Sequence, residues 1–101
     1  MFGLKESEII AMREILASFP EVDEAVIYGS RARGTNRPSS DIDLTLKGED
    51  LTYLQLALID ARMDDLMMPY FLDVSLLKML KDPDLLDCIQ REGKTFYLKN
   101  H

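Results

Sequence analysis

The segment DIDLTLK, residues 41–47, alternates polar and apolar residues and so constrains the fold strongly. Successive side chains of a β-strand point to opposite faces of a sheet, and strict alternation therefore predicts a strand with one buried face and one open face. The open face would carry Asp41, Asp43 and Thr45. The apolar residues of the buried face are Ile42, Leu44 and Leu46. The segment YFLDVS, residues 70–75, alternates in the same way and places Asp73 on its polar face.

The rest of the chain alternates strands with helices. We expect helices at 7–19, 51–63 and 83–92, a helical turn from Ser30, and a broken helical stretch at 76–80. The expected strands are 22–28, 41–47, 70–75 and 95–98. In the helix at 51–63 the residues expected to face inward are Leu51, Leu54, Leu58 and Ile59. This order predicts one α/β (α+β) domain over residues 1–101, with a small mixed sheet flanked by helices.

Charge and composition narrow the classes of function. The net charge is −6 and the pI is about 4.6, so the chain lacks the dense basic face needed to hold a long nucleic acid. We expect neither a membrane span, because no apolar run is long enough, nor a signal peptide, because residues 1–5 show no basic stretch followed by an apolar one. A single cysteine, Cys88, fits a reducing cytoplasm. We therefore expect a cytoplasmic protein whose acidic surface suits divalent cations or a basic protein partner.

Three carboxylates are the candidate catalytic residues. Asp41 and Asp43 lie about 7 Å apart along one strand face. Asp73 would join them if its strand is the neighbour, roughly 4.8 Å away. Clustered carboxylates repel, and a divalent cation removes that penalty; oxygen ligands favour magnesium or manganese. Three acids can hold two metal ions about 3.5–4 Å apart, as in-line attack at phosphorus requires. The weaker competitors, at the end of a predicted helix, are Asp60, Asp64 and Asp65.

A Gly-Ser turn precedes the acidic strand. Gly29 would let the backbone approach a ligand, and Ser30 would begin a helical turn whose free amides suit phosphate. The nearby arginines that add positive charge are Arg31, Arg33 and Arg37. One end of the segment at 27–46 would then hold a triphosphate, and the other would hold metal ions. Taken singly, the turn, the acidic strand and the basic loop also have ordinary structural explanations.

The joint pattern resembles a known family. Gly-Ser, ten residues and then DID, preceded by AVIY, resembles the signature of the DNA polymerase beta-like nucleotidyltransferase superfamily. GSRARG, SDIDL, FLDV and REGKTFY resemble its minimal nucleotidyltransferase (MNT) group. The resemblance implies that Gly29 and Ser30 bind the triphosphate of ATP and that Asp41 and Asp43 hold two Mg²⁺ ions. It also implies that Asp73 binds the catalytic metal and helps to activate the attacking hydroxyl.

The resemblance also implies a partner. Minimal nucleotidyltransferases usually pair with a helical HEPN protein, which in several pairs is a ribonuclease toxin that the antitoxin modifies with AMP on a tyrosine. We therefore expect an Mg-dependent adenylyltransferase acting as the antitoxin of a HEPN toxin. One departure is Tyr28, where the family is expected to have Phe; its hydroxyl would reach solvent.

Other functions remain open from the sequence. The protein could neutralise its partner by contact alone, or it could transfer a nucleotide to a small molecule or an RNA end. A receiver-like domain with Asp43 as phospho-acceptor ranks last, because its lysine and threonine have no convincing counterparts. A homodimer is a further assembly that a small domain with an open surface allows.

Overall fold

The computed structural model describes residues 1–99; the last two residues of the predicted domain, Asn100 and His101, lie outside the described residues. The helices are α1 (Glu6–Ala17), α2 (Ser30–Arg33), α3 (Tyr53–Asp64) and α4 (Pro83–Glu92), with a 3₁₀ turn η1 (Leu77–Met79). The strands are β1 (Glu24–Tyr28), β2 (Ile42–Lys47), β3 (Leu72–Leu76) and β4 (Lys94–Leu98). The predicted order is confirmed, with ends shifted by a few residues.

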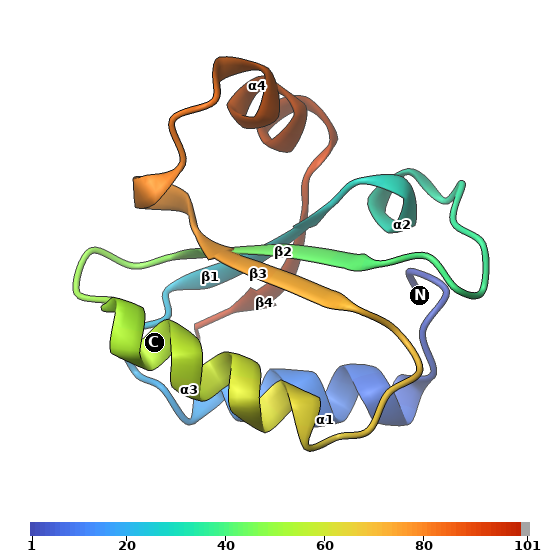
Figure 1. Ribbon diagram of the computed structural model, residues 1–101, viewed down its shortest axis with the longest axis horizontal. Coiled ribbons are helices and arrows are strands. Elements are labelled where there is room, and N and C mark those ends of the chain that lie inside the picture. Colours follow the sequence, from blue (N-terminus) through green and yellow to red (C-terminus); the bar gives the residue numbers. More distant parts are fainter. Residues whose placement is uncertain (100–101) are drawn as a thin grey trace.

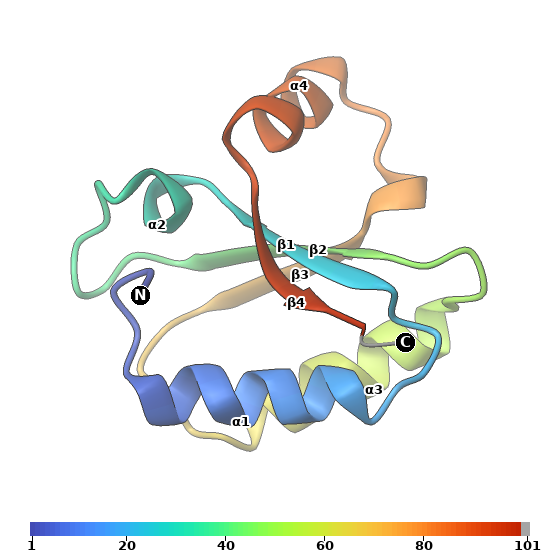
Figure 2. The ribbon, with the colours of Figure 1, turned by 180° about the vertical axis from the view of Figure 1, so that it is seen from behind.

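The four strands form one mixed sheet in the order β3-β2-β1-β4. The β1 strand runs antiparallel to both β2 and β4, whereas β2 and β3 are parallel, as strands joined by a crossover helix usually are. Helices α1 and α3 cover one face of the sheet, and α4 lies across the other (Figures 1 and 2). The predicted mixed sheet flanked by helices is therefore confirmed.

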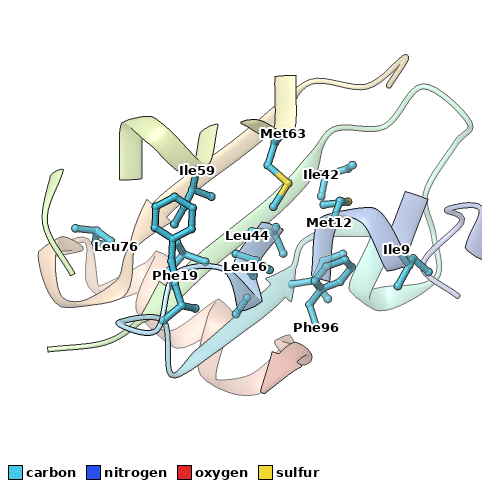
Figure 3. Packing of buried hydrophobic residues seen from close by; sticks show 14 of the residues in the cluster. Ile9, Met12, Leu16, Phe19, Ile42, Leu44, Ile59, Met63, Leu76 and Phe96 are labelled. Atoms are coloured by element: carbon cyan, nitrogen blue, oxygen red, sulfur yellow. The ribbon is translucent and has the colours of Figure 1, made fainter. Parts of the chain in front are cut away.

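The main core lies between the sheet and the α1–α3 layer (Figure 3). The α1 helix contributes Ile9, Met12 and Leu16, whose spacing of three and four residues places them on one side of the helix. The sheet contributes the predicted apolar face of β2, namely Ile42, Leu44 and Leu46. A core of this kind anchors β2 firmly, so the residues of its other face are held in fixed positions.

The predicted inward face of α3 is wrong in part. Leu54 and Leu58 are 71% and 45% exposed, and the buried residues of the helix are Ile59 and Met63. Leu51 is buried, as predicted, but it lies before the helix, which starts after the Thr52 cap. The predicted inward face, which is counted from Leu51, is therefore rotated relative to the buried face of the helix. As a result, the side chains of Leu54 and Leu58 are exposed to solvent.

A smaller apolar cluster lies on the opposite face of the sheet. There Ile89 of α4 packs with Val26 and Tyr28 of β1. Pro83 at the first turn and Gly93 at the end bound α4, as the sequence predicts. Within residues 1–99, no helix has the length and apolar character needed to cross a membrane.

Candidate functional site

The candidate site is built on one row of residues that crosses three strands. Tyr28 of β1 pairs with Asp43 of β2, and Asp43 pairs in turn with Asp73 of β3. Paired residues on neighbouring strands point to the same face, so the three side chains share the face on which α4 lies. The predicted placement of Asp73 beside the acidic strand is thus confirmed. The sequence predicts Asp41 to be the first residue of its strand. In the structure β2 begins at Ile42, so Asp41 directly precedes it.

Burial and the negative charges of the neighbouring carboxylates shift the pKa of Asp43. The pKa of Asp43 lies above its ordinary value, first because burial disfavours the charged form, then because the charges of Asp73 and Asp41 repel it. A cation would relieve this repulsion, and an oxygen-only donor set suits Mg²⁺. Among residues 1–99 no group of three such side chains is arranged to enclose a metal ion. The donor chemistry of the three acids therefore fits a divalent cation.

The Gly-Ser turn lies against this row. Gly29 has φ +80° and ψ −158°, a conformation that side chains disfavour strongly. A Cβ atom at Gly29 would lie 2.6 Å from Oδ2 of Asp43, so any larger residue there requires the carboxylate to shift. The helical turn begins at Ser30, as predicted; Gly29 precedes it at the N-cap position, and its carbonyl accepts a hydrogen bond from the Arg33 N–H. The first turn after Ser30 keeps free amide groups near the acids, as any helix start does.

Arg31 has a structural role that sequence reasoning missed. Its side chain is 1% exposed and donates hydrogen bonds to the carbonyls of Phe2, Pro38 and Ser40. The guanidinium also lies 4.6 Å from the ring centre of Tyr70. Arg31 thus ties the 34–40 loop to α2, and because Ser40 directly precedes Asp41 it sets where Asp41 enters the site. No signal in the sequence separates this arginine from its neighbours.

The other two arginines are at the surface. Arg33 forms an ion pair with Glu92 of α4 at 2.9 Å. Arg37 is exposed, and its backbone N–H donates to Oγ of Ser40. All three arginines are expected to add positive charge for a triphosphate. Among the described residues, the Arg31 side chain is bound in a buried network and the Arg33 side chain is bound in an ion pair. Within residues 1–99, only the side chain of Arg37 takes part in neither.

Tyr28 is a largely buried residue of the sheet face that carries Asp43, with 7% of its surface exposed. That its hydroxyl reaches solvent stays a prediction. Burial and then the charges of Asp73 and Asp43 raise the pKa of the Tyr28 phenol. The next two paired residues on this face, Thr45 and Ser75, both carry hydroxyl groups. Oγ of Ser75 donates a hydrogen bond to Oγ1 of Thr45 at 3.0 Å. Residues 24–28 do not alternate between polar and apolar, so the strand pairing was needed to place Tyr28 on this face beside Asp43.

Comparison with known proteins identifies the family. The family described as Polymerase beta, Nucleotidyltransferase matches residues 11–101. The chain belongs to this nucleotidyltransferase family. The match to a nucleotidyltransferase family leaves the alternative of a receiver-like domain, with Asp43 as phospho-acceptor, without support. No curated protein matches the chain.

Solved structures share the fold at low sequence identity. A chain of a toxin–antitoxin crystal structure with AMP-PNP is 21% identical, with a TM-score of 0.73 over 96% of this chain and 76% of that one. A chain from the complex of the tri-AMPylated Shewanella oneidensis HEPN toxin with the MNT antitoxin is 18% identical, with a TM-score of 0.65 over 98% and 74%. A nucleotidyltransferase described as putative, from Sulfolobus solfataricus, is 21% identical, with a TM-score of 0.53 over 93% and 86%.

Proposed function

We propose that this nucleotidyltransferase moves AMP from ATP to a tyrosine hydroxyl of a HEPN toxin and so acts as its antitoxin in the cytoplasm. The observation that carries the proposal is the position of Gly29 against the carboxylate of Asp43, where an added Cβ would lie 2.6 Å from Oδ2, together with the pairing of Asp43 with Asp73. Two similar folds come from toxin–antitoxin structures, one described with AMP-PNP and one with an AMPylated HEPN toxin, which supports both the nucleotide and the partner.

Each site residue has a proposed role. The backbone at Gly29 and Ser30 holds the triphosphate of ATP, and Asp41, Asp43 and Asp73 hold two Mg²⁺ ions. When bound, Mg²⁺ neutralises phosphate charge and lowers the pKa of the attacking hydroxyl. Asp73, exposed on an edge strand, orients that hydroxyl and accepts its proton. A bond forms between the hydroxyl oxygen and the α-phosphorus, the bond from that phosphorus to the bridging oxygen breaks, and pyrophosphate leaves.

An intact-mass experiment tests the proposal. The purified protein is mixed with Mg-ATP and with the product of the neighbouring reading frame, the candidate HEPN partner, and both chains are weighed. We expect one or more AMP units on the HEPN protein, and none when Asp41→Asn replaces the wild type. Because Asp41 is exposed and makes no side-chain hydrogen bond within residues 1–99, this variant should keep its fold. An Asp41→Asn variant that transfers AMP at the wild-type rate would refute the metal-site assignment.

Neutralisation by contact alone is the second candidate. The exposed Leu54 and Leu58 of α3 favour it, because apolar side chains at the surface often mark a protein interface. The two candidates differ in cells that produce the HEPN toxin. If Asp41→Asn protects such cells as well as the wild type does, contact carries the function; if protection is lost while the complex still forms, transfer carries it.

A further inference from the structure

Two clefts adjoin along the outer edge of the sheet. The first has a volume of about 160 Å³ and the second about 370 Å³, and both are lined by Asp60 of α3 and Leu72 of β3. Phe71 borders the first cleft and Asp73 borders the second. We call the two together the α3–β3 groove. In Figure 1, α3 and β3 lie side by side toward the viewer.

The backbone of β3 is free on its groove side. β3 is the last strand of the sheet, and no other strand of the described chain pairs with its outer edge. The N–H of Ile42 donates to the carbonyl of Phe71, which fixes the direction of the ladder between β2 and β3. In a parallel ladder alternate residues face the neighbour, so the polar backbone groups of Leu72 and Val74 point outward. Such an edge is a template for an additional extended strand.

Within the described chain, the charged residues that line the groove are all acidic. Asp60 and Asp64 line it from α3. Asp73 of β3 also borders it, but its side chain points to the face of the sheet on which α4 lies. No lysine or arginine contributes to the lining of either cleft, as far as residues 1–99 are concerned. The basic residue of α3, Arg62, lies elsewhere; its guanidinium is 4.9 Å from the ring centre of Phe19 and donates to Oγ of Ser18. The groove therefore complements a positively charged chain.

Aromatic side chains stand exposed in both clefts. Tyr53, at the start of α3, is 63% exposed, and Phe71, just before β3, is 81% exposed. Aromatic residues of this kind supply much of the binding energy at protein interfaces when a partner covers them. Tyr53 lines the cleft that Asp73 also borders, so the aromatic contacts lie on the α3 side of β3 and the Asp73 carboxylate lies on the α4 side of the same edge strand.

We propose that the α3–β3 groove binds the acceptor segment of the protein substrate as an extended strand added to β3. Apolar side chains of that segment cover Tyr53 and Phe71, its lysines or arginines lie beside Asp60 and Asp64, and its hydroxyl residue lies at Asp73. This inference rests on the proposed function, since it names the surface through which the protein acceptor reaches the site. It commits to a basic, extended protein segment and excludes an acidic one.

The test uses charge reversal, with a single reversal outside the groove as its control. Asp60→Lys/Asp64→Lys is compared with Glu14→Lys, which reverses an exposed charge on α1, outside the groove. The affinity for the neighbouring HEPN protein is measured by calorimetry without ATP, and affinity for Mg-ATP is measured separately. We expect the double variant to bind the HEPN protein at least tenfold more weakly and the control within twofold. Mg-ATP binding should stay unchanged in both.

Hydrogen exchange adds a second readout. In the wild-type complex the amides of Leu72 and Val74 should exchange more slowly than in the free protein, because an added strand would occupy their outward N–H groups. Equal HEPN affinity in all variants, with no slowing at these two amides, overturns the groove proposal even if AMP transfer proceeds. Groove binding without AMP transfer supports the docking surface and refutes the transfer reaction. Absence of any HEPN binding overturns both.

Discussion

Replacing Gly29 by alanine tests how the turn and the acidic strand depend on each other. The new Cβ would lie 2.6 Å from Oδ2 of Asp43, and the backbone there has φ +80° and ψ −158°. A non-glycine residue in that region costs on the order of 1–3 kcal/mol, and the collision places the expected cost at about 3 kcal/mol. An unfolding entropy of about 2 cal/mol/K per residue converts this cost to a fall of roughly 14 °C in Tm.

Gly34 offers a matched control, because it also has a positive φ, +79°, but a Cβ there meets no atom within 4 Å. We expect Gly34→Ala to cost about 1 kcal/mol, or roughly 5 °C, through backbone strain alone. The excess cost at Gly29 therefore measures the collision with Asp43. Shortening that side chain in the double variant Gly29→Ala/Asp43→Ala should recover about 1–2 kcal/mol of the loss, since the two positions touch.

Thermal unfolding by circular dichroism and AMP transfer measured by intact mass are the two assays. Gly29→Ala should lose transfer at temperatures where it is still folded, because the carboxylate of Asp43 must move, whereas Gly34→Ala should keep transfer. If the two alanine variants have the same Tm and the same transfer rate, the contact between Gly29 and Asp43 has no energetic consequence. The argument for a joint nucleotide and metal site would then fail.

Two further predictions concern charge. The pKa of Asp43 is raised in the folded state, so folding favours its protonated form, and the stability of the metal-free protein should fall as the pH rises through that pKa. Asp43→Asn should make stability depend less on pH in urea titrations without metal, and it should raise Tm at pH 7 by a few degrees. A steeper pH dependence in this variant would contradict burial and carboxylate repulsion as the causes of the raised pKa. Arg31→Met leaves the carbonyls bound by Arg31 without donors and should cost about 3 kcal/mol of unfolding free energy in urea. The control Arg33→Met breaks only an exposed ion pair and should cost under about 1 kcal/mol, so equal losses would refute the structural role of Arg31.

Local patterns determined much of the fold. The period of two in residues 41–47 was enough to separate the buried face of β2 from the face that carries Asp43, because strand geometry allows no other division. The spacing of Ile9, Met12 and Leu16 was equally sufficient for α1. On α3 the same reasoning failed for Leu54 and Leu58, since a helix with apolar residues on more than one side does not reveal which side meets the sheet.

The sequence alone thus determined the elements, their order and the acidic and glycine residues of the candidate site, because each depends on neighbours within a few positions. Only the tertiary structure decided which strands adjoin, and this pairing put Asp73 opposite Asp43 across 30 residues of chain and Tyr28 on its other side. It also buried Arg31 under a loop and left an acidic groove beside β3. Register and burial depend on contacts between distant segments, and no local period encodes these contacts.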